Sequence, residues 1–450
     1  MKGKRLLVTL LAASLITCAF AGCSQDKGGS ESGGESGWSD YSDVEGAQKL
    51  PDTLENPNLS IVYWNNADQY ATQKEQDPNV YDAILEAIPD FEAKYGGKVT
   101  VEFVAWGDMI PTATNMQNSG EAPDLIEVYD RVMHNVIFSG LVQPLDEYVT
   151  DEDYAYYKID RSLFSWKEHT YAIPIKPYLK YIMYNKDLFD LNGLTYPDEL
   201  FRQGKWNWDE FEKAGQAITT RKDGNIDTFG FGGWAEIFNQ FVVADGSSLL
   251  KIDTAAGTAA SNLKSNQVQN TINKFREWLG PNGFIQIDDN GSMFDSWNNG
   301  KLGMIVGQEF PNLNAFEVGM APLPAGPDVE AGKKTVYMYP QAFAIPDGAK
   351  NPEGAAAFMR LVNNKQLAVG DAKEAARYGQ ENYDMIYADD VTYLYAYDTA
   401  TANIDKIVSS IINSAYDQVP AATIVETIEP QLVSDVQLVY GGKESFTPAE

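Results

Sequence analysis

The sequence predicts an α/β fold with a mainly parallel sheet, divided into two lobes or domains. Strand-like and helix-like segments alternate from Leu59 onward, which is the order expected when crossover helices join parallel strands. The chain is also long, with 450 residues of which 44% are hydrophobic. That length and composition can fill two hydrophobic cores rather than one.

Three strand candidates open the folded part of the chain, because each is rich in β-branched, aliphatic and aromatic residues. They cover 59–64, 99–104 and 124–128. The stretch from Tyr81 to Tyr95 places its apolar residues on one helical face, and Pro89 should kink or divide that helix. A second helix is expected over 109–117, so the order is strand, helix, strand, helix, strand.

The same alternation returns later in the chain. Further strands are expected at 181–184 and 302–306. Asn207 followed three residues later by Glu210 indicates a capped helix start, and Asn351 followed by Pro352 indicates another.

The amino terminus has the layout of a secretory signal peptide. Basic residues within 1–5 precede an uncharged apolar run from Leu6 to Ala21, which is too short for a membrane-spanning helix with its flanks. We expect a leader at 1–22 that is cleaved before Cys23. The Gly- and Ser-rich sequence that follows predicts a flexible tether over 23–56.

The overall charge and the scarce residue types exclude several classes of protein. The 34 basic and 64 acidic residues give a net charge of −30, which disfavours nucleic acid as a partner. The leader would remove Cys18, one of two cysteines, so we expect no disulfide in the mature chain. The two histidines, His134 and His169, are too few for a clustered metal site, and we expect no cofactor.

Candidate binding residues follow the predicted strands, because ligands of open α/β sheets bind beyond the carboxyl ends of strands. These residues are Trp64, Asn65, Asn66, Trp106, Asp108, Tyr129, Asp130, Arg131, Gln308, Glu309 and Phe310. Trp234 follows the glycine-rich stretch 229–233 and could be presented to a ligand by it.

The mixture of rings, amides and carboxylates suits a sugar, whose C–H faces pack on rings while its hydroxyls need donors and acceptors. Taken singly, these rings could equally belong to the core. A peptide, polyamine or other cationic solute is an alternative, because acids and rings also hold cations. A glycoside-processing enzyme is a weaker alternative. Such an enzyme needs a pair of carboxylates, but among 64 acidic residues some pair is always found, so its presence is little evidence for an enzyme.

Two resemblances sharpen this interpretation. The residues Ala19-Phe-Ala-Gly-Cys23 resemble a bacterial lipobox, apart from Phe20 where leucine is usual. The chain from Leu59 to Val362 resembles the extracellular solute-binding proteins of bacterial carbohydrate importers, the family that includes maltose-binding protein. The segments that carry this second resemblance, in family order, are 91–101, 120–126, 140–146, 171–174, 184–189, 208–211, 300–304, 318–324 and 343–346.

The family resemblance implies a two-lobed, periplasmic-binding-protein-like type II fold with a hinge and an interlobe cleft. Lobe 1 is expected at 57–176 plus 320–365, and lobe 2 at 177–319 plus 366–450. The chain would pass between the lobes near 175–180, near 316–320 and again after about Val362.

The resemblance also implies a function and a site. Asp130 and Arg131 are expected as the main polar contacts to the sugar, with Tyr178 and Tyr339 close to the crossovers. The protein would be a monomer without enzymatic activity that delivers its sugar to the permease of an ABC importer. The lipobox resemblance implies acylation of Cys23, with palmitate as the expected lipid, and anchoring at the extracellular face of the cell membrane.

Overall fold

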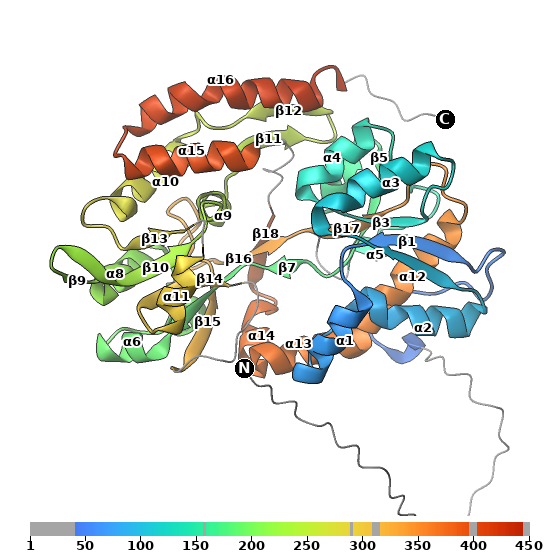
Figure 1. The fold of residues 1–450 in the computed structure, drawn as a ribbon, viewed down its shortest axis with the longest axis horizontal. Helices are drawn as coiled ribbons and strands as arrows, with labels where there is room; N and C mark the ends of the chain where they lie inside the picture. The colour runs from blue at the N-terminus through green and yellow to red at the C-terminus, as the bar shows by residue number, and fades with distance from the viewer. Residues whose placement is uncertain (1–40, 156–158, 289–290, 308–315, 396–402, 444–450) are drawn as a thin grey trace, which may run out of the picture. The chain divides into compact units, whose positions relative to one another are not determined.

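The structure, a computed structural model, describes residues 41–155, 159–288, 291–307, 316–395 and 403–443. Two sheets form the centres of two lobes, and helices pack against both (Figure 1). The alternation of strands and helices inferred from the sequence is confirmed. Among the described residues, no helix combines the length and the apolar character needed to cross a bilayer.

The first sheet has the strand order β2-β1-β3-β17-β6. Strands β2 and β3 run parallel to β1, while β17 runs antiparallel to both β3 and β6. Four of the five strands therefore point the same way, as a mainly parallel sheet requires. Their bounds are β1 (Leu59–Tyr63), β2 (Val99–Phe103), β3 (Leu125–Tyr129), β6 (Ala172–Pro174) and β17 (Gln341–Ala344).

The helices of the first lobe cover this sheet, and Figure 1 shows α2 and α12 side by side. The helical elements are η1 (Tyr41–Asp43), α1 (Ala67–Gln76), α2 (Ala83–Tyr95), η2 (Trp106–Asp108), α3 (Met109–Asn118), α4 (Asp130–Phe138), α5 (Glu152–Ala155), η3 (Arg161–Phe164) and α12 (Pro352–Lys365). A small hairpin pairs β4 (Ser165–Trp166) with β5 (His169–Thr170). Helix α2 continues through Pro89 and is not divided there.

The second sheet has the strand order β13-β10-β14-β8-β15, and the short β9 pairs with β10. Strands β13 and β14 run parallel to β10, and β8 runs antiparallel to both β14 and β15. The bounds are β8 (Tyr181–Asn185), β9 (Thr220–Lys222), β10 (Asn225–Gly233), β13 (Ile285–Ile287), β14 (Leu302–Gly307) and β15 (Val318–Pro322). The strands expected at 181–184 and 302–306 are thus confirmed.

The second lobe adds helices and a hairpin, and α15 and α16 run side by side (Figure 1). The helices are α6 (Lys186–Leu191), α7 (Pro197–Arg202), α8 (Trp208–Ile218), α9 (Ile237–Ala244), α10 (Asn266–Leu279), α11 (Ser292–Asn298), α15 (Ile404–Tyr416) and α16 (Ala421–Tyr440). The hairpin pairs β11 (Leu250–Asp253) with β12 (Thr258–Ser261). Asn207 caps α8 as expected, by accepting a hydrogen bond from the backbone N–H of Glu210.

A third, smaller sheet joins segments that run between the two main sheets. Strand β16 (Lys334–Tyr339) pairs with β7 (Tyr178–Leu179) on one side and β18 (Val391–Leu394) on the other. The π-helical segment η4 (Gln366–Gly370) continues α12 into α13 (Asp371–Tyr378), and α14 (Gln380–Ile386) follows. The chain leaves the first sheet at Pro174 and enters the second at Tyr181, which encloses the expected passage at 175–180.

The expected return to the first lobe near 316–320 is wrong. Strand β15 pairs with β8 from Val318 opposite Asn185 to Pro322 opposite Tyr181, so it belongs to the second sheet. The chain rejoins the first sheet only at Gln341. A short apolar strand fits either sheet, and only its hydrogen-bonded partner decides between them.

The expected tether is also too long at its carboxyl end. Tyr41 donates a hydrogen bond to Asp90 at 2.5 Å, and the backbone of Gln48 exchanges two hydrogen bonds with the side chain of Asn364. Tyr95 donates to the carbonyl of Pro51 at 2.8 Å. The chain is therefore attached to the first lobe from Tyr41 onward, because a few spaced side chains find partners in an otherwise polar stretch.

Candidate functional site

Three aromatic rings meet where the first three strands end. Trp64 follows β1, Trp106 follows β2 and Tyr129 ends β3. The ring centroids lie 5.4 Å apart for Trp64 and Trp106, and 4.7 Å apart for Trp106 and Tyr129. Trp106 is 36% exposed, so this aromatic shelf is open to solvent. Because the three strands run parallel, their carboxyl ends bring together residues that lie far apart in sequence.

A cavity of about 390 Å³ adjoins the shelf, and Trp64 belongs to both. We call this cavity the strand-end pocket. Its walls come from the loop after β1, helix α1, the start of α2, the segment 175–179 and the stretch from α12 to α13. The volume lies within the range of small-molecule sites.

The strand-end pocket combines flat rings with amides. Six of its lining residues are aromatic and seven carry a side-chain amide. The aromatic residues are Tyr63, Trp64, Tyr70, Tyr81, Tyr178 and Tyr378. The amide residues are Asn65, Gln69, Gln73, Asn79, Gln341, Asn363 and Gln366. An amide both donates and accepts hydrogen bonds, so this lining can pair with hydroxyl groups in either direction.

Asp82 organises the floor of the strand-end pocket. Its carboxylate accepts hydrogen bonds from the Tyr63 hydroxyl at 3.0 Å, from Asn65 Nδ2 at 2.5 Å and from the backbone N–H of Leu85 at 3.0 Å. Burial raises the pKa of Asp82, and these three donors oppose that rise. Burial, with the nearby charges of Asp82 and Glu127, also raises the pKa of Tyr63. The tyrosine is therefore neutral and remains a donor.

Lys176 ties the segment 175–179 to α13. Its Nζ lies 2.7 Å from Asp371 Oδ1 and 2.5 Å from Glu374 Oε2, and 4.8 Å from the centre of the Tyr383 ring. Burial alone would lower the pKa of Lys176, but the charges of Glu374 and Asp371 outweigh it and raise the pKa. The lysine therefore stays charged and holds one wall of the pocket in place.

Arg131 connects the two lobes instead of lining the pocket. Its guanidinium lies 2.6 Å from Asp405 in α15 and 3.8 Å from Glu236 at the start of α9. Glu236 is two residues from Trp234, whose ring lies 5.6 Å from that of the 41% exposed Phe294. Trp234 follows β10 in the second lobe and is not among the residues that line the strand-end pocket.

The structure brings together some of the residues predicted as binding residues and leaves others apart. Trp64, Asn65 and Tyr178 line the strand-end pocket. Asn66 is occupied as the cap of α1, where its side chain accepts from the N–H groups of Asp68 and Gln69. Asp108 is exposed and does not line the strand-end pocket. Tyr339 does not line it either, and its ring faces Lys180 Nζ at 5.2 Å.

Some of the predicted residues lie outside the part that the structure describes. They are Cys23, Gln308, Glu309, Phe310 and the side chain of Asp130. The backbone of Asp130 is described, and it begins α4.

Sequence reasoning missed Asp82, Lys176, Gln341 and the residues of α13. Asp82 had a readable signal, because an aspartate just before an apolar helix is a preferred cap, and it caps α2 here. The α13 residues had none, because only the fold brings positions beyond 370 next to the end of β1.

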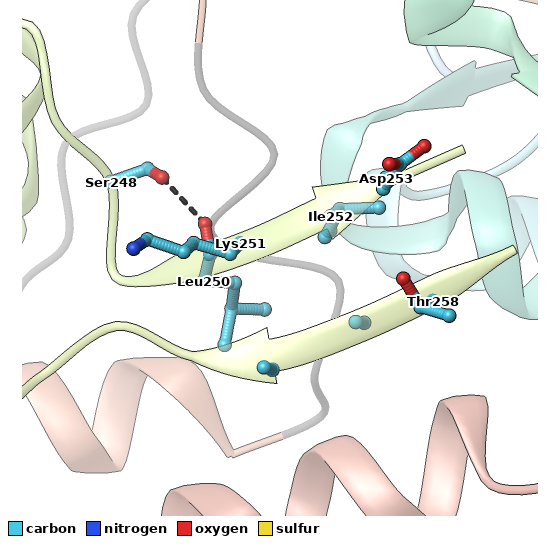
Figure 2. A pocket seen from close by; sticks show the side chains of 8 residues that line it. Ser248, Leu250, Lys251, Ile252, Asp253 and Thr258 are labelled. Atoms are coloured by element: carbon cyan, nitrogen blue, oxygen red, sulfur yellow. Dashed lines mark hydrogen bonds between the residues drawn. The ribbon is translucent and has the colours of Figure 1, made fainter. Parts of the chain in front are cut away.

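A second hollow, of about 420 Å³, lies over the hairpin of β11 and β12 (Figure 2). Ser248 donates a hydrogen bond to the carbonyl of Leu250 at 2.5 Å at its edge. No ring lines it, and its two charged side chains, Lys251 and Asp253, are exposed. Although slightly larger, this hollow offers less to recognise a solute than the strand-end pocket does.

The histidines do not form a metal site. His134 is buried and shares a hydrogen bond of 2.9 Å with the Tyr440 hydroxyl, while His169 pairs with Asp146 at 2.8 Å. Within the described ranges, no group of three or more metal-ligating side chains converges.

This arrangement of two α/β lobes, joined by several segments, is that of a substrate-binding protein. The chain belongs to the family of bacterial extracellular solute-binding proteins, whose family model matches residues 75–368.

Curated relatives match part of the chain. A protein of Brucella abortus described as a binding protein is 25% identical over 288 residues, which cover 59% of this chain and 64% of that protein. The multiple sugar-binding protein of Streptococcus mutans is 24% identical over 241 residues, covering 51% of this chain and 46% of that protein. The chain thus matches less than two thirds of the length of either relative.

Solved structures share the fold across most of the chain. The cyclic α-maltosyl-1,6-maltose binding protein of Arthrobacter globiformis matches with a TM-score of 0.63 and 15% identity, covering 85% of this chain and 99% of that one. An ABC substrate-binding protein of Listeria monocytogenes in complex with cycloalternan matches with a TM-score of 0.60 and 14% identity. That match covers 87% of this chain and 100% of the other.

Proposed function

We propose that the protein captures a sugar or oligosaccharide in the strand-end pocket and along the aromatic shelf, and delivers it to the permease of an ABC importer. The observation that carries this proposal is the lining of six rings and seven amides beside an exposed tryptophan. Rings pack on the C–H faces of a sugar, and amides pair with its hydroxyls. The sugar-binding relative and the two glycan-binding structural neighbours support the same class of solute.

Capture would proceed by hinge closure. The two lobes are joined through 175–180, through the segment that holds β16 and through the stretch from α12 to β18. A solute that contacts both lobes favours the closed state by the free energy of the added contacts. The Cys23 lipid would keep the carrier at the extracellular face of the cell membrane.

A thermal-shift screen of the mature chain tests the proposal. Mono- and oligosaccharides form the test set, and peptides and polyamines are the controls. We expect one glycan class to raise the melting temperature without being degraded on long incubation. A shift with polyamines or peptides alone would replace the proposal with a cationic-solute carrier, and breakdown of the glycan would replace it with an enzyme.

The lipid anchor has its own test. Cells that express the full chain would be labelled with a palmitate analogue and separated into membrane and medium fractions. We expect label and protein in the membrane fraction, and both lost from it in the Cys23→Ala variant. Unlabelled protein in the medium of cells expressing the unchanged chain would contradict the anchor and leave sugar capture untouched.

A further inference from the structure

The charges around the strand-end pocket do not balance. Two basic side chains line it, and both are already paired with carboxylates. Lys176 pairs with Asp371 and Glu374, and Arg377 Nε lies 3.2 Å from Asp77 Oδ2. Neither base is therefore available to neutralise a further acid in the pocket.

Asp82 is such an acid. The groups that donate to its carboxylate, which are Tyr63, Asn65 and the backbone N–H groups of Leu85 and Ile84, are all neutral. None of the ion pairs among the described residues includes Asp82. These donors occupy the acceptor positions of the carboxylate but carry no full charge, so Asp82 keeps a negative charge that no base offsets. The side chain is partly exposed to the pocket that it lines, so a solute can approach it.

A second carboxylate lies behind the first. Glu127 is in the middle of β3 and is 1% exposed. Burial and the charge of Asp82 raise its pKa, which the Trp64 indole opposes. No donor among the described residues, Trp64 Nε1 included, reaches Glu127 Oε2 with hydrogen-bond geometry. The raised pKa favours the uncharged form of Glu127, so the attraction for a positive charge comes from Asp82, whose field is only weakly screened in a buried site.

The rings around Asp82 add to this attraction. Tyr63, Trp64, Tyr70, Tyr81 and Tyr178 all line the same pocket, and aromatic faces attract cations. A neutral sugar would satisfy the amides but would leave Asp82 without a counter-charge. An ammonium group would supply that charge, and burying a charge costs less free energy when it is paired.

We propose that the solute of the strand-end pocket is an amino sugar, free or within an oligosaccharide, whose unacylated and positively charged amino group is bound by Asp82. This inference rests on the proposed capture of a saccharide and specifies its class. Asp82 then determines specificity, while the amides and rings bind the remainder of the sugar.

Calorimetric titration of the mature chain tests this with matched sugars that differ at one position. Glucosamine and galactosamine, and β-1,4-linked glucosamine oligomers, are each compared with the N-acetylated and the neutral counterparts. Spermidine is the non-sugar control. We expect the amino form to bind at least about tenfold more tightly than either counterpart, as a charge-assisted hydrogen bond supplies.

The variants separate Asp82 from the rest of the pocket. Asp82→Asn keeps an oxygen to cap α2 and should lose the tenfold preference for the amino form. Glu102→Gln, an exposed carboxylate of the same lobe outside the pocket, is the matched control and should keep the preference. Should Asp82→Asn fail to fold, the preference of the unchanged chain should still decrease as the pH falls and Asp82 takes up a proton.

Three results would overturn the inference. If neutral or acetylated sugars bind as tightly as the amino sugars, or more tightly, recognition of the amino group is excluded. The proposed capture of a saccharide is then unaffected. Failure of every amino sugar to bind overturns the inference as well. Binding of spermidine with no binding of any sugar would overturn the proposed function itself.

Discussion

The core of the second lobe and the strand ends of the first lobe use aromatic side chains in different ways. In the second lobe they form a core, in which fully buried Phe211 contacts Trp278 at 5.3 Å and Phe231 at 5.1 Å between ring centroids. In the first lobe, rings from three strand ends form a shelf whose outer member, Trp106, is 36% exposed. The comparison shows that position, and not the number of rings, separates a binding surface from a core.

The largest expected effect is on stability, and it tests whether the rings of the second lobe form a core. Phe211→Ala should lower the free energy of unfolding by about 3–5 kcal/mol, because it leaves a cavity among packed rings. Trp106→Ala is the matched change in the shelf and should cost less than about 1 kcal/mol. Denaturant unfolding of both variants measures this. Similar losses of unfolding free energy in the two variants would mean that the aromatic shelf is part of the core, and the contrast between the two regions would not hold.

A second test concerns the buried polar contact between the lobes. His134 in α4 of the first lobe meets Tyr440 at the end of α16. Burial lowers the pKa of His134 from 6.5 to about 4. As the pH falls, His134 is therefore protonated in the unfolded chain at a higher pH than in the folded protein. The stability linked to His134 is complete above pH 6.5 and declines as the pH falls from there to about 4. The loss amounts to about 3 kcal/mol.

Unfolding curves between pH 7.5 and pH 4 would measure that loss. His134→Gln should show a weaker pH dependence than the unchanged chain. Identical slopes in the two proteins would show that His134 is not shielded from solvent in the folded state.

The third test compares matched helix caps in the two lobes. Asn351 is buried, caps α12 and also donates to the carbonyls of Asn56 and Asn58, at 2.6 and 2.9 Å. Asn207 caps α8 at an exposed position. Asn351→Ala should therefore destabilise by about 2–3 kcal/mol and Asn207→Ala by about 1 kcal/mol. Equal losses would mean that the bonds to residues 56 and 58 contribute nothing.

The smallest effect concerns binding. Trp106→Ala should weaken affinity for the sugar by up to about tenfold, because it removes one stacking ring while the pocket remains. Isothermal titration against the glycan from the screen measures this, with Phe294→Ala, an exposed ring of the second lobe, as the comparison. An unchanged affinity in Trp106→Ala would restrict the binding site to the strand-end pocket.

The sequence was sufficient for the elements and for part of the site. Strand patterns predicted β1, β2 and β3, and the rule for open α/β sheets selected Trp64, Trp106 and Tyr129 as candidates at the strand ends. Most of the other tryptophans belong to the core, because Trp166, Trp206, Trp208, Trp278 and Trp297 are all buried. Whether a ring lies in the core depends on contacts between distant elements, which single segments do not reveal.

Other features could not be read from local pattern. The assignment of β15 to the second sheet depends on its pairing with β8. The role of Lys176 depends on α13, almost two hundred residues away in the chain. Glu127 could have been recognised in the sequence, because it is the single acidic residue in an otherwise apolar strand. Burying a charge without a partner costs free energy, so a lone acidic residue in an apolar strand indicates a candidate functional position.

Hydrogen–deuterium exchange with and without the glycan identified in the screen tests the central claim most directly. If the strand-end pocket binds the solute, protection should increase in the peptides that contain 63–84, 175–179 and 362–378. Peptides that cover the hairpin of β11 and β12 should change little. Protection confined to 248–260, with none around the strand-end pocket, would contradict the claim and place binding at the other hollow.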